Sequence, residues 1–173
     1  MAKETAGLIQ IYSGDGKGKT TAALGLAMRA AGHGMKVVFI QFMKGEPGGE
    51  HLFVSQHQPF SIVQLSTGDI FTKSDEQLKA EAQQTLEYAE QEMVGGGYDL
   101  VILDEILVAI NRGFITTQQV LDLLDKKPDP VELVLTGRRA PREITQRADL
   151  VTEMLMIKHP FVEGVGARRG IEY

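Results

Sequence analysis

The sequence predicts an α/β fold of three layers, in which helices cover both faces of a mostly parallel sheet. Short apolar runs recur along the chain, stretches with helical spacing lie between several of them, and capping signals mark helix starts. Crossover helices between strands make neighbouring strands parallel. The apolar runs, interpreted as buried strands, are residues 8–12, 37–42, 61–65, 100–103, 132–135 and 150–157.

Three stretches between these runs have the spacing of amphipathic helices. They are residues 20–31, 75–93 and 117–125. Ser74 with Gln77, and Thr116 with Gln119, have capping-box spacing ahead of the second and third stretches. The buried face of the second helix is predicted to carry Leu78, Ala82, Leu86 and Met93.

Length and composition indicate an ordinary globular chain. The 173 residues, 43% hydrophobic and 24% charged, suffice for one sizeable core, so we expect residues 1–173 to form a single domain. A net charge of -5 argues against a nucleic-acid-binding surface. The chain has no cysteine, which excludes disulfides, thiolate nucleophiles and iron–sulfur clusters. It has neither a signal peptide nor a run of ~18 apolar residues, so we expect no membrane span and a cytoplasmic location.

The sequence SGDGKGKTT, residues 13–21, lies directly between an apolar run and a helical stretch. Glycines there let the backbone wrap a phosphate, and a helix N-terminus favours negative charge. Gly18, Lys19 and Thr20 match the end of the P-loop pattern, whereas Ser13 replaces its leading glycine. The alternative, a glycine-rich turn with solvated lysines, fits this context poorly. The expected fold is therefore the P-loop NTPase (RecA-like) fold. The expected nucleotide-binding residues are Ser13, Gly14, Asp15, Gly16, Lys17, Gly18, Lys19, Thr20 and Thr21.

A second motif, DLVILDE at residues 99–105, is an apolar strand that ends in two carboxylates. Ligands bind at the carboxyl ends of strands in open α/β sheets, so this motif has the character of a Walker B strand. By analogy, Lys19 reaches phosphate oxygens and the Thr20 hydroxyl binds magnesium, with Asp104 or Glu105 opposite, directly or through water. The alternative is that the two carboxylates cap the next helix.

Arginines follow the fifth apolar run in the sequence TGRR, residues 136–139. If the sheet is parallel throughout, Arg138 or Arg139 lies at the same edge as the P-loop, where a guanidinium can clamp phosphate. A surface loop with solvated arginines explains the motif equally well. The same two interpretations apply to Lys158, His159, Arg168 and Arg169.

Taken together, these motifs resemble the cobalamin-pathway ATP:corrinoid adenosyltransferases of the P-loop type. The resemblance covers nearly the whole chain and rests on GDGKGKTTAALGLAMRAAGHG, VVFIQFMKGEPGGE, YDLVILDE, TGRRAP and ADLVTEMLMIKHPFVEGVGARRGIEY. It implies transfer of the 5′-deoxyadenosyl group of ATP to the Co(I) of a corrinoid, with release of triphosphate. It also implies a homodimer, and a flavoprotein or other reductant that reduces the cobalt.

The resemblance also implies roles for individual residues. Residues 14–21 would bind the triphosphate in an orientation reversed from that of ordinary P-loop enzymes. Thr20 and Glu105, with Asp104 as the alternative carboxylate, would hold Mg²⁺ or Mn²⁺. The catalytic charges would be Lys19 and Arg138, which stabilise the departing triphosphate.

On the corrinoid side, Phe71 would contact the substrate, although a phenylalanine is more often a core side chain. The family's Gly-Phe-Thr-Trp segment has Lys73 in place of Trp in this chain. From the short N-terminus, residues 1–6, we expect no separate lid over the corrinoid, and Arg168 stands where Gln is usual.

Two other functions are compatible with the same motifs. A P-loop NTPase or kinase would act at the γ-phosphate and leave ADP, whereas adenosyl transfer leaves triphosphate. A non-catalytic module would bind ATP or a corrinoid without turnover. The sequence identifies neither the corrinoid nor the reductant.

Overall fold

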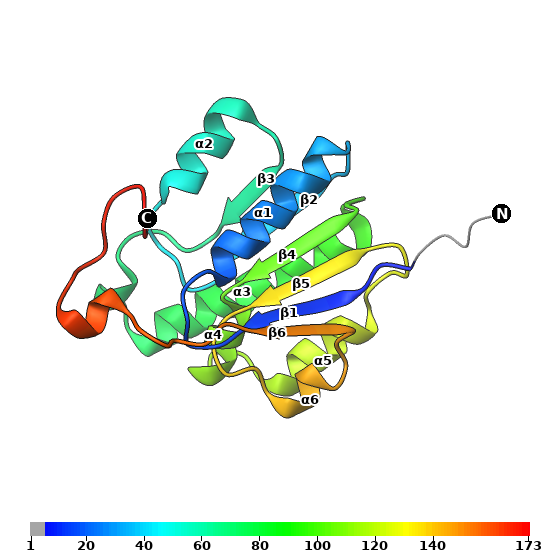
Figure 1. The fold of residues 1–173 in the computed structure, drawn as a ribbon. Helices are drawn as coiled ribbons and strands as arrows, with labels where there is room; N and C mark the ends of the chain where they lie inside the picture. The colour runs from blue at the N-terminus through cyan, green and yellow to red at the C-terminus, as the bar shows by residue number, and fades with distance from the viewer. Residues whose placement is uncertain (1–5) are drawn as a thin grey trace.

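The computed structural model describes residues 6–173 and has a six-stranded parallel sheet at its centre (Figure 1). The strand order is β3-β2-β4-β5-β1-β6, and every strand pair is parallel. The predicted α/β class with a parallel sheet is therefore confirmed. The N-terminal segment, from which the sequence predicted no lid, lies almost entirely outside the described residues. The strands are β1 (Ile9–Ser13), β2 (Val37–Gln41), β3 (Ser61–Gln64), β4 (Leu100–Asp104), β5 (Glu132–Thr136) and β6 (Leu150–Glu153).

Helices flank the sheet on both faces. The three predicted helices are confirmed, and both predicted capping boxes form: Ser74 exchanges hydrogen bonds with Gln77, and Thr116 with Gln119. The helices α2, α4 and α6 were not predicted from the sequence. Of these, α4 and α6 are too short to show helical periodicity. The α-helices are α1 (Lys19–Gly32), α2 (Gly49–His57), α3 (Asp75–Gly95), α4 (Ile106–Asn111), α5 (Thr117–Asp125) and α6 (Arg142–Thr145). The 3₁₀ helices are η1 (Ile70–Thr72) and η2 (Pro160–Glu163). No helix in the described part of the chain combines the length and the apolar character required to span a membrane.

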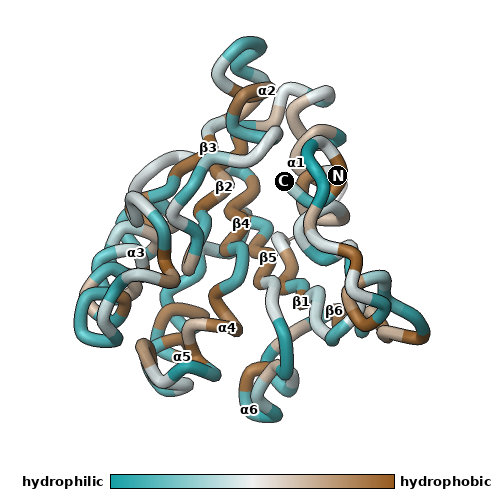
Figure 2. The backbone as a smooth tube through the Cα atoms, turned by 90° about the vertical axis from the view of Figure 1, so that its left-hand side faces the viewer, coloured by the Kyte–Doolittle hydropathy of each residue, from teal (hydrophilic) through white to brown (hydrophobic). Residues whose placement is uncertain are grey.

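Alternate residues of the central strands face two separate cores, which makes the fold three-layered. On one face, small side chains of α1 pack against β2, β4 and β5; on the other, α3, α4, α5 and α6 cover the sheet (Figure 1). The central strands β2 and β4 are buried along their whole length, and Figure 2 shows hydrophobic residues concentrated between the helical layers. In α3 the predicted face is confirmed, since Leu78, Ala82, Leu86 and Met93 are all buried.

The last apolar run departs from the prediction of a buried strand. The strand β6 ends at Glu153, and all four of its residues are exposed. It pairs with β1 on one side only, at the edge of the sheet. An apolar run alone does not show whether a strand will be central or at an edge, so this prediction was wrong in both burial and length.

The sheet order positions the functional motifs. Strand β5 lies between β1, which leads into the P-loop, and β4, which ends at Asp104. Because all three strands are parallel, their carboxyl ends meet at one edge. The P-loop, the two carboxylates of DLVILDE and the segment after β5 therefore come together there.

Candidate active site

The P-loop connects β1 to α1 through a backbone that only glycine accommodates at several points. Gly14 and Gly18 have φ values of 105° and 119°, in the left-handed region. The Gly16 N–H donates a hydrogen bond of 2.7 Å to the carbonyl of Met154, just after β6, and a Cβ on Gly16 would lie 2.7 Å from that oxygen. The loop thus needs glycine partly because the chain after β6 lies against it.

The two lysines of the loop have different partners. Lys19 is buried, and its Nζ donates to the carbonyl of Gly16 at 2.7 Å. Burial lowers the pKa of Lys19, and the nearby Glu105 carboxylate opposes that shift. Lys17 is half-exposed and forms a 2.8 Å ion pair with Glu172, near the C-terminus. Both lysines belong to the loop, but only the Lys19 side chain is buried.

Asp104 is the hub of a buried hydrogen-bond network. Its Oδ1 accepts from the hydroxyls of Thr20 at 3.0 Å and Thr136 at 2.7 Å, and its Oδ2 accepts from Gln41 Nε2 at 3.2 Å. The residue is only 2% exposed, and burial raises the pKa of Asp104 although the hydrogen bonds oppose that shift. The Thr20 hydroxyl donates to Asp104, which leaves its oxygen lone pairs free for another partner.

Glu105 is held in a backbone conformation that is rare for a non-glycine residue. Its φ is 61°, and its N–H donates to the Thr136 hydroxyl at 2.9 Å. It occupies the N-cap position of α4, but its side chain makes no capping hydrogen bond. Helix capping therefore does not account for this carboxylate. Burial raises the pKa of Glu105, and the adjacent Asp104 raises it further.

Thr20, Asp104 and Glu105 form a set of oxygen donors suited to a hard divalent cation. Both carboxylates are in surroundings that disfavour their negative charge, which a bound cation would offset. Among residues 6–173, no group of three or more His, Asp or Glu side chains is arranged to hold a metal alone. The side chains therefore fit Mg²⁺ in the way typical of P-loop sites, where nucleotide oxygens complete the coordination.

A cavity of about 570 Å³ opens over the P-loop. Arg138 lines it, with Nη1 3.8 Å from Asp15 Oδ1, and the carbonyl of Arg138 accepts a 2.6 Å hydrogen bond from Asn111. Arg139 is not among the lining residues. Ser13 is not either: its hydroxyl accepts the Ala140 N–H at 3.2 Å and joins the P-loop to the segment after β5. Of the predicted residues, the cavity brings together Asp15, Gly16, Lys17, Gly18, Lys19, Thr20, Thr21, Glu105 and Arg138.

Comparison with known proteins shows which family this chain belongs to. Residues 5–173 match the family described as ATP:corrinoid adenosyltransferase BtuR/CobO/CobP. The chain belongs to this family. The corrinoid adenosyltransferase of Escherichia coli (strain K12) is 35% identical over 176 residues, which cover 100% of this chain and 89% of that protein. Those of Pseudomonas aeruginosa and Sinorhizobium sp are 35% and 36% identical, with 100% of this chain and 87% and 84% of theirs covered.

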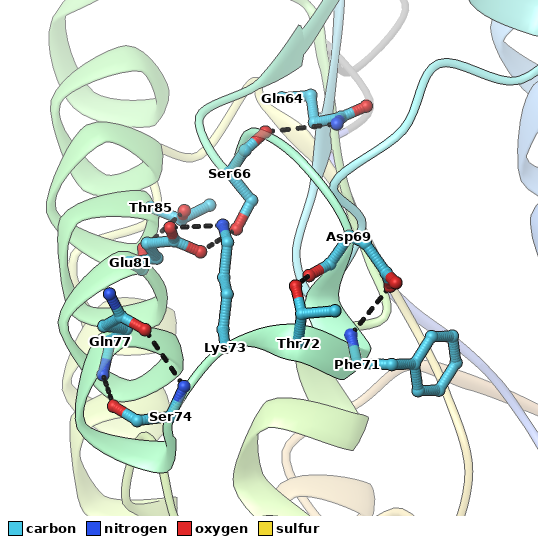
Figure 3. A network of polar contacts seen from close by, with 10 residues as sticks. All are labelled: Gln64, Ser66, Asp69, Phe71, Thr72, Lys73, Ser74, Gln77, Glu81 and Thr85. Atoms are coloured by element: carbon cyan, nitrogen blue, oxygen red, sulfur yellow. Dashed lines mark hydrogen bonds and ion pairs between the residues drawn. The ribbon is translucent and has the colours of Figure 1, made fainter.

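The segment expected on the family's corrinoid side lies between β3 and α3. Phe71, in η1, is 92% exposed, so the alternative that it is a core side chain is wrong. The Lys73 side chain reaches Glu81 on α3, with which its Nζ pairs, whereas the Phe71 ring projects away from α3 (Figure 3). The two residues on either side of Thr72 therefore face different parts of the molecule.

Several lining residues were not singled out from the sequence. Lys44 and Glu50, which form an ion pair at the cavity, lie within the segment VVFIQFMKGEPGGE. The Lys44 ammonium holds the pKa of Glu50 below its ordinary value, even though burial acts in the opposite direction. The resemblance of this segment to the family was the only indication that it belongs to the site, because Lys44 and Glu50 are not part of a recognisable motif. The C-terminal residues Gly170, Ile171, Glu172 and Tyr173 also line the cavity.

The remaining basic residues near the C-terminus have mixed placements. His159 lines the cavity, and Arg168 forms a bidentate pair with Glu172, at 2.9 and 3.1 Å. Lys158 pairs with Glu163 at 3.0 Å. The Glu172 carboxylate thus joins the tail cation Arg168 to the P-loop cation Lys17, and these contacts lower the pKa of Glu172.

Proposed function

We propose that this chain transfers the 5′-deoxyadenosyl group of ATP to the Co(I) of a reduced corrinoid, with triphosphate as the leaving group. The observation that carries the proposal is the cavity over the P-loop, which Lys19 and Arg138 line together with Glu105, the residue that follows β4. The cobalt electron pair forms the bond to C5′, while the bond between C5′ and the α-phosphate oxygen breaks and its electrons leave with triphosphate. Such a step needs no nucleophilic side chain.

In this reaction the protein acts by positioning and by charge. All three phosphates depart as one highly charged group, so cations around the leaving oxygen stabilise the transition state more than the ground state. We assign this role to Lys19 and Arg138, with Lys17 contributing after it exchanges Glu172 for phosphate. Residues 14–21 would hold the triphosphate in the reversed orientation.

The metal belongs to the same proposal. Thr20 and Glu105 would bind Mg²⁺ or Mn²⁺ together with phosphate oxygens, and the cation would supply further charge stabilisation of the leaving group. Asp104 accepts the Thr20 hydroxyl proton in a hydrogen bond and so turns the oxygen lone pairs toward the metal position. Its own oxygens are occupied by three hydrogen bonds, which favours Glu105 as the direct carboxylate ligand.

The proposal extends to substrates and partners. The exposed ring of Phe71 is suited to contact the apolar face of a corrinoid, and a flavoprotein or other reductant would deliver the electron to cobalt. A homodimer and a cytoplasmic location are further parts of it.

Product analysis tests the reaction. The chain is incubated under reducing conditions with ATP, Mg²⁺ and a corrinoid, and phosphorus NMR is combined with the visible spectrum of the corrinoid. We expect triphosphate and the adenosylcorrinoid in equal amounts. ADP and inorganic phosphate, formed in step with turnover and without a new cobalt–carbon bond, would instead establish a γ-phosphate NTPase. Nucleotide binding without any product would establish a binding module.

A further inference from the structure

The segment between β3 and α3, residues 65–74, is fastened to the fold at both of its ends by one carboxylate. Glu81, in the second turn of α3, accepts a hydrogen bond from the hydroxyl of Ser66 and pairs with Nζ of Lys73. Figure 3 shows these two side chains meeting at Glu81 from opposite ends of the segment. We call Ser66, Lys73 and Glu81 the loop anchor.

The loop anchor is largely shielded from solvent. Ser66 is 6% exposed, and the side chains of Lys73 and Glu81 are 14% and 25% exposed. A pair in such a position is screened less than a surface pair, and removal of one partner leaves the other charge poorly solvated. Glu81 is itself held in the helix, where its carbonyl accepts the Thr85 hydroxyl at 2.7 Å. The anchor thus ties a loop to a regular element with a large buried face.

Between its fixed ends, the segment presents Phe71. The Asp69 carboxylate caps η1 by accepting the Phe71 N–H at 2.9 Å, and the Thr72 hydroxyl donates to the Asp69 carbonyl at 2.8 Å. These bonds define the turn itself. They do not fix the turn relative to the sheet. Ile70, which packs against the core, and the loop anchor do so.

The segment also abuts the loop that carries Lys44 of the nucleotide cavity. A Cβ on Gly45 would lie 1.7 Å from the carbonyl oxygen of Gly68, so the two backbones are in direct contact there. Residues 65–74 therefore lie beside the loop that forms one wall of the nucleotide cavity.

We propose that Lys73 is a positioning residue, which through Glu81 and Ser66 holds residues 65–74 ready to present Phe71 to the corrinoid. This inference rests on the proposed function for the identity of the ligand. A loop that is ordered before binding avoids the entropic cost of being ordered by the ligand. The loop anchor therefore lowers KM for the corrinoid and does not change KM for ATP.

The test uses Lys73→Met, which keeps the side-chain length but removes the charge, and Lys73→Arg, which keeps the charge. Lys126→Met is the matched control, since Lys126 pairs with Glu90 on the same helix, far along it from the anchor. We expect Lys73→Met to raise KM for the corrinoid by about tenfold, with KM for ATP unchanged, because contacts to an unanchored loop form at an entropic cost. Lys73→Arg should restore most of the loss, and Lys126→Met should match the unmodified chain. Equal corrinoid KM values in Lys73→Met and the unmodified chain would overturn the proposal, as would a parallel rise in KM for ATP.

A second measurement tests the loop anchor without any corrinoid. The chain has no tryptophan, so Phe71→Trp introduces a single fluorescent reporter at the tip of the loop. In this background, Lys73→Met and Glu81→Gln should lower the fluorescence anisotropy of Trp relative to Lys73→Arg and Lys126→Met at equal thermal stability. Unchanged anisotropy would refute the anchor, whether or not the chain adenosylates a corrinoid. Failure of the product analysis together with reduced anisotropy would refute the proposed function while the anchor stands.

Discussion

At the scale of single residues, Lys19 has a buried ammonium group whose hydrogen-bond partner is a backbone carbonyl. The Gly16 carbonyl that it contacts belongs to the loop expected to wrap the phosphates. We expect Lys19→Ala to weaken ATP binding by about 10- to 100-fold, the scale of a lost hydrogen bond to a charged group, and to leave the fold intact. Calorimetric titration with ATP measures the loss, with Lys126→Ala as a control for a surface lysine. Undiminished affinity would contradict the assignment.

Glu105 and Asp104 are adjacent carboxylates that differ in their freedom to bind metal. Because the Asp104 oxygens are engaged by Thr20, Thr136 and Gln41, we expect Glu105→Gln to raise the Mg²⁺ concentration for half-maximal activity by about tenfold or more. A metal titration of adenosylation measures the shift. If the titration curve does not move, Asp104 is the direct ligand.

The raised pKa of Asp104 also predicts how stability depends on pH. In the folded chain burial favours the protonated carboxyl, so the contribution to stability is fully present below the unfolded pKa and is lost as pH rises through the raised folded pKa. Asp104→Asn lacks this loss. In the absence of ligands, we expect the Tm of the variant to rise relative to that of the unmodified chain as pH increases from 4 to 8, by about 2–4 °C for each kcal/mol of free energy of unfolding. We also expect the variant to lose activity. Differential scanning calorimetry across that pH range measures Tm, and an adenosylation assay measures the activity; parallel Tm curves would contradict the prediction.

At the scale of elements, the segment after β5 is fixed by the close approach of Gly137 to α4. Gly137 has a φ of 140°, and a Cβ there would lie 2.7 Å from the Cβ of Leu107, which is fully buried. Arg138 follows directly, so a displaced Gly137 displaces the guanidinium. Gly137→Ala is expected to cost about 1–3 kcal/mol in the free energy of unfolding and to lower kcat.

The matched control for this variant is Gly34→Ala. Gly34 also has a positive φ, 79°, but a Cβ there meets no atom within 4 Å. Chemical denaturation and steady-state kinetics of both variants separate backbone strain from steric overlap. A Gly34→Ala variant that is as inactive as Gly137→Ala would show that overlap with α4 is not the cause.

At the scale of the whole molecule, many apolar side chains between the start of β6 and Val165 are exposed. Exposed apolar residues next to an open strand edge are typical of a protein interface. The exposed residues are Leu150, Val151, Leu155, Met156, Ile157, Phe161, Val162 and Val165. This surface supports the proposed homodimer.

Sedimentation equilibrium tests the dimer. We expect a mass of twice the 19.0 kDa of the chain, and we expect Ile157→Glu to shift the equilibrium toward the monomer by placing a charge in the interface. Leu52→Glu, which changes an exposed leucine on α2, serves as the control. A monomeric unmodified chain at micromolar concentration would refute the homodimer.

By itself, the sequence determined the features that depend on neighbours along the chain. Apolar runs and helical spacing identified the central strands and the helices α1, α3 and α5, because periodicity reports which side chains share a face. The capping boxes at Ser74 and Thr116 and the P-loop at residues 13–21 were likewise predictable, since each motif is complete within a few residues. The sequence also predicted a pair of carboxylates at the end of β4, but not which of the two, Asp104 or Glu105, is available to a metal.

Only the tertiary structure decided which distant groups meet. The order of the strands brings Thr136, and also Thr20 from 84 positions away, to the same oxygen of Asp104. These contacts distinguish the hydrogen-bonded Asp104 from the more available Glu105. The tertiary structure also put β6 at an exposed edge and gave Lys73 its partner on α3. The physical reason is the same in each case: a side chain's charge and type are local, whereas its partner and its burial depend on the sheet order and on the packing of loops that carry no periodic signal.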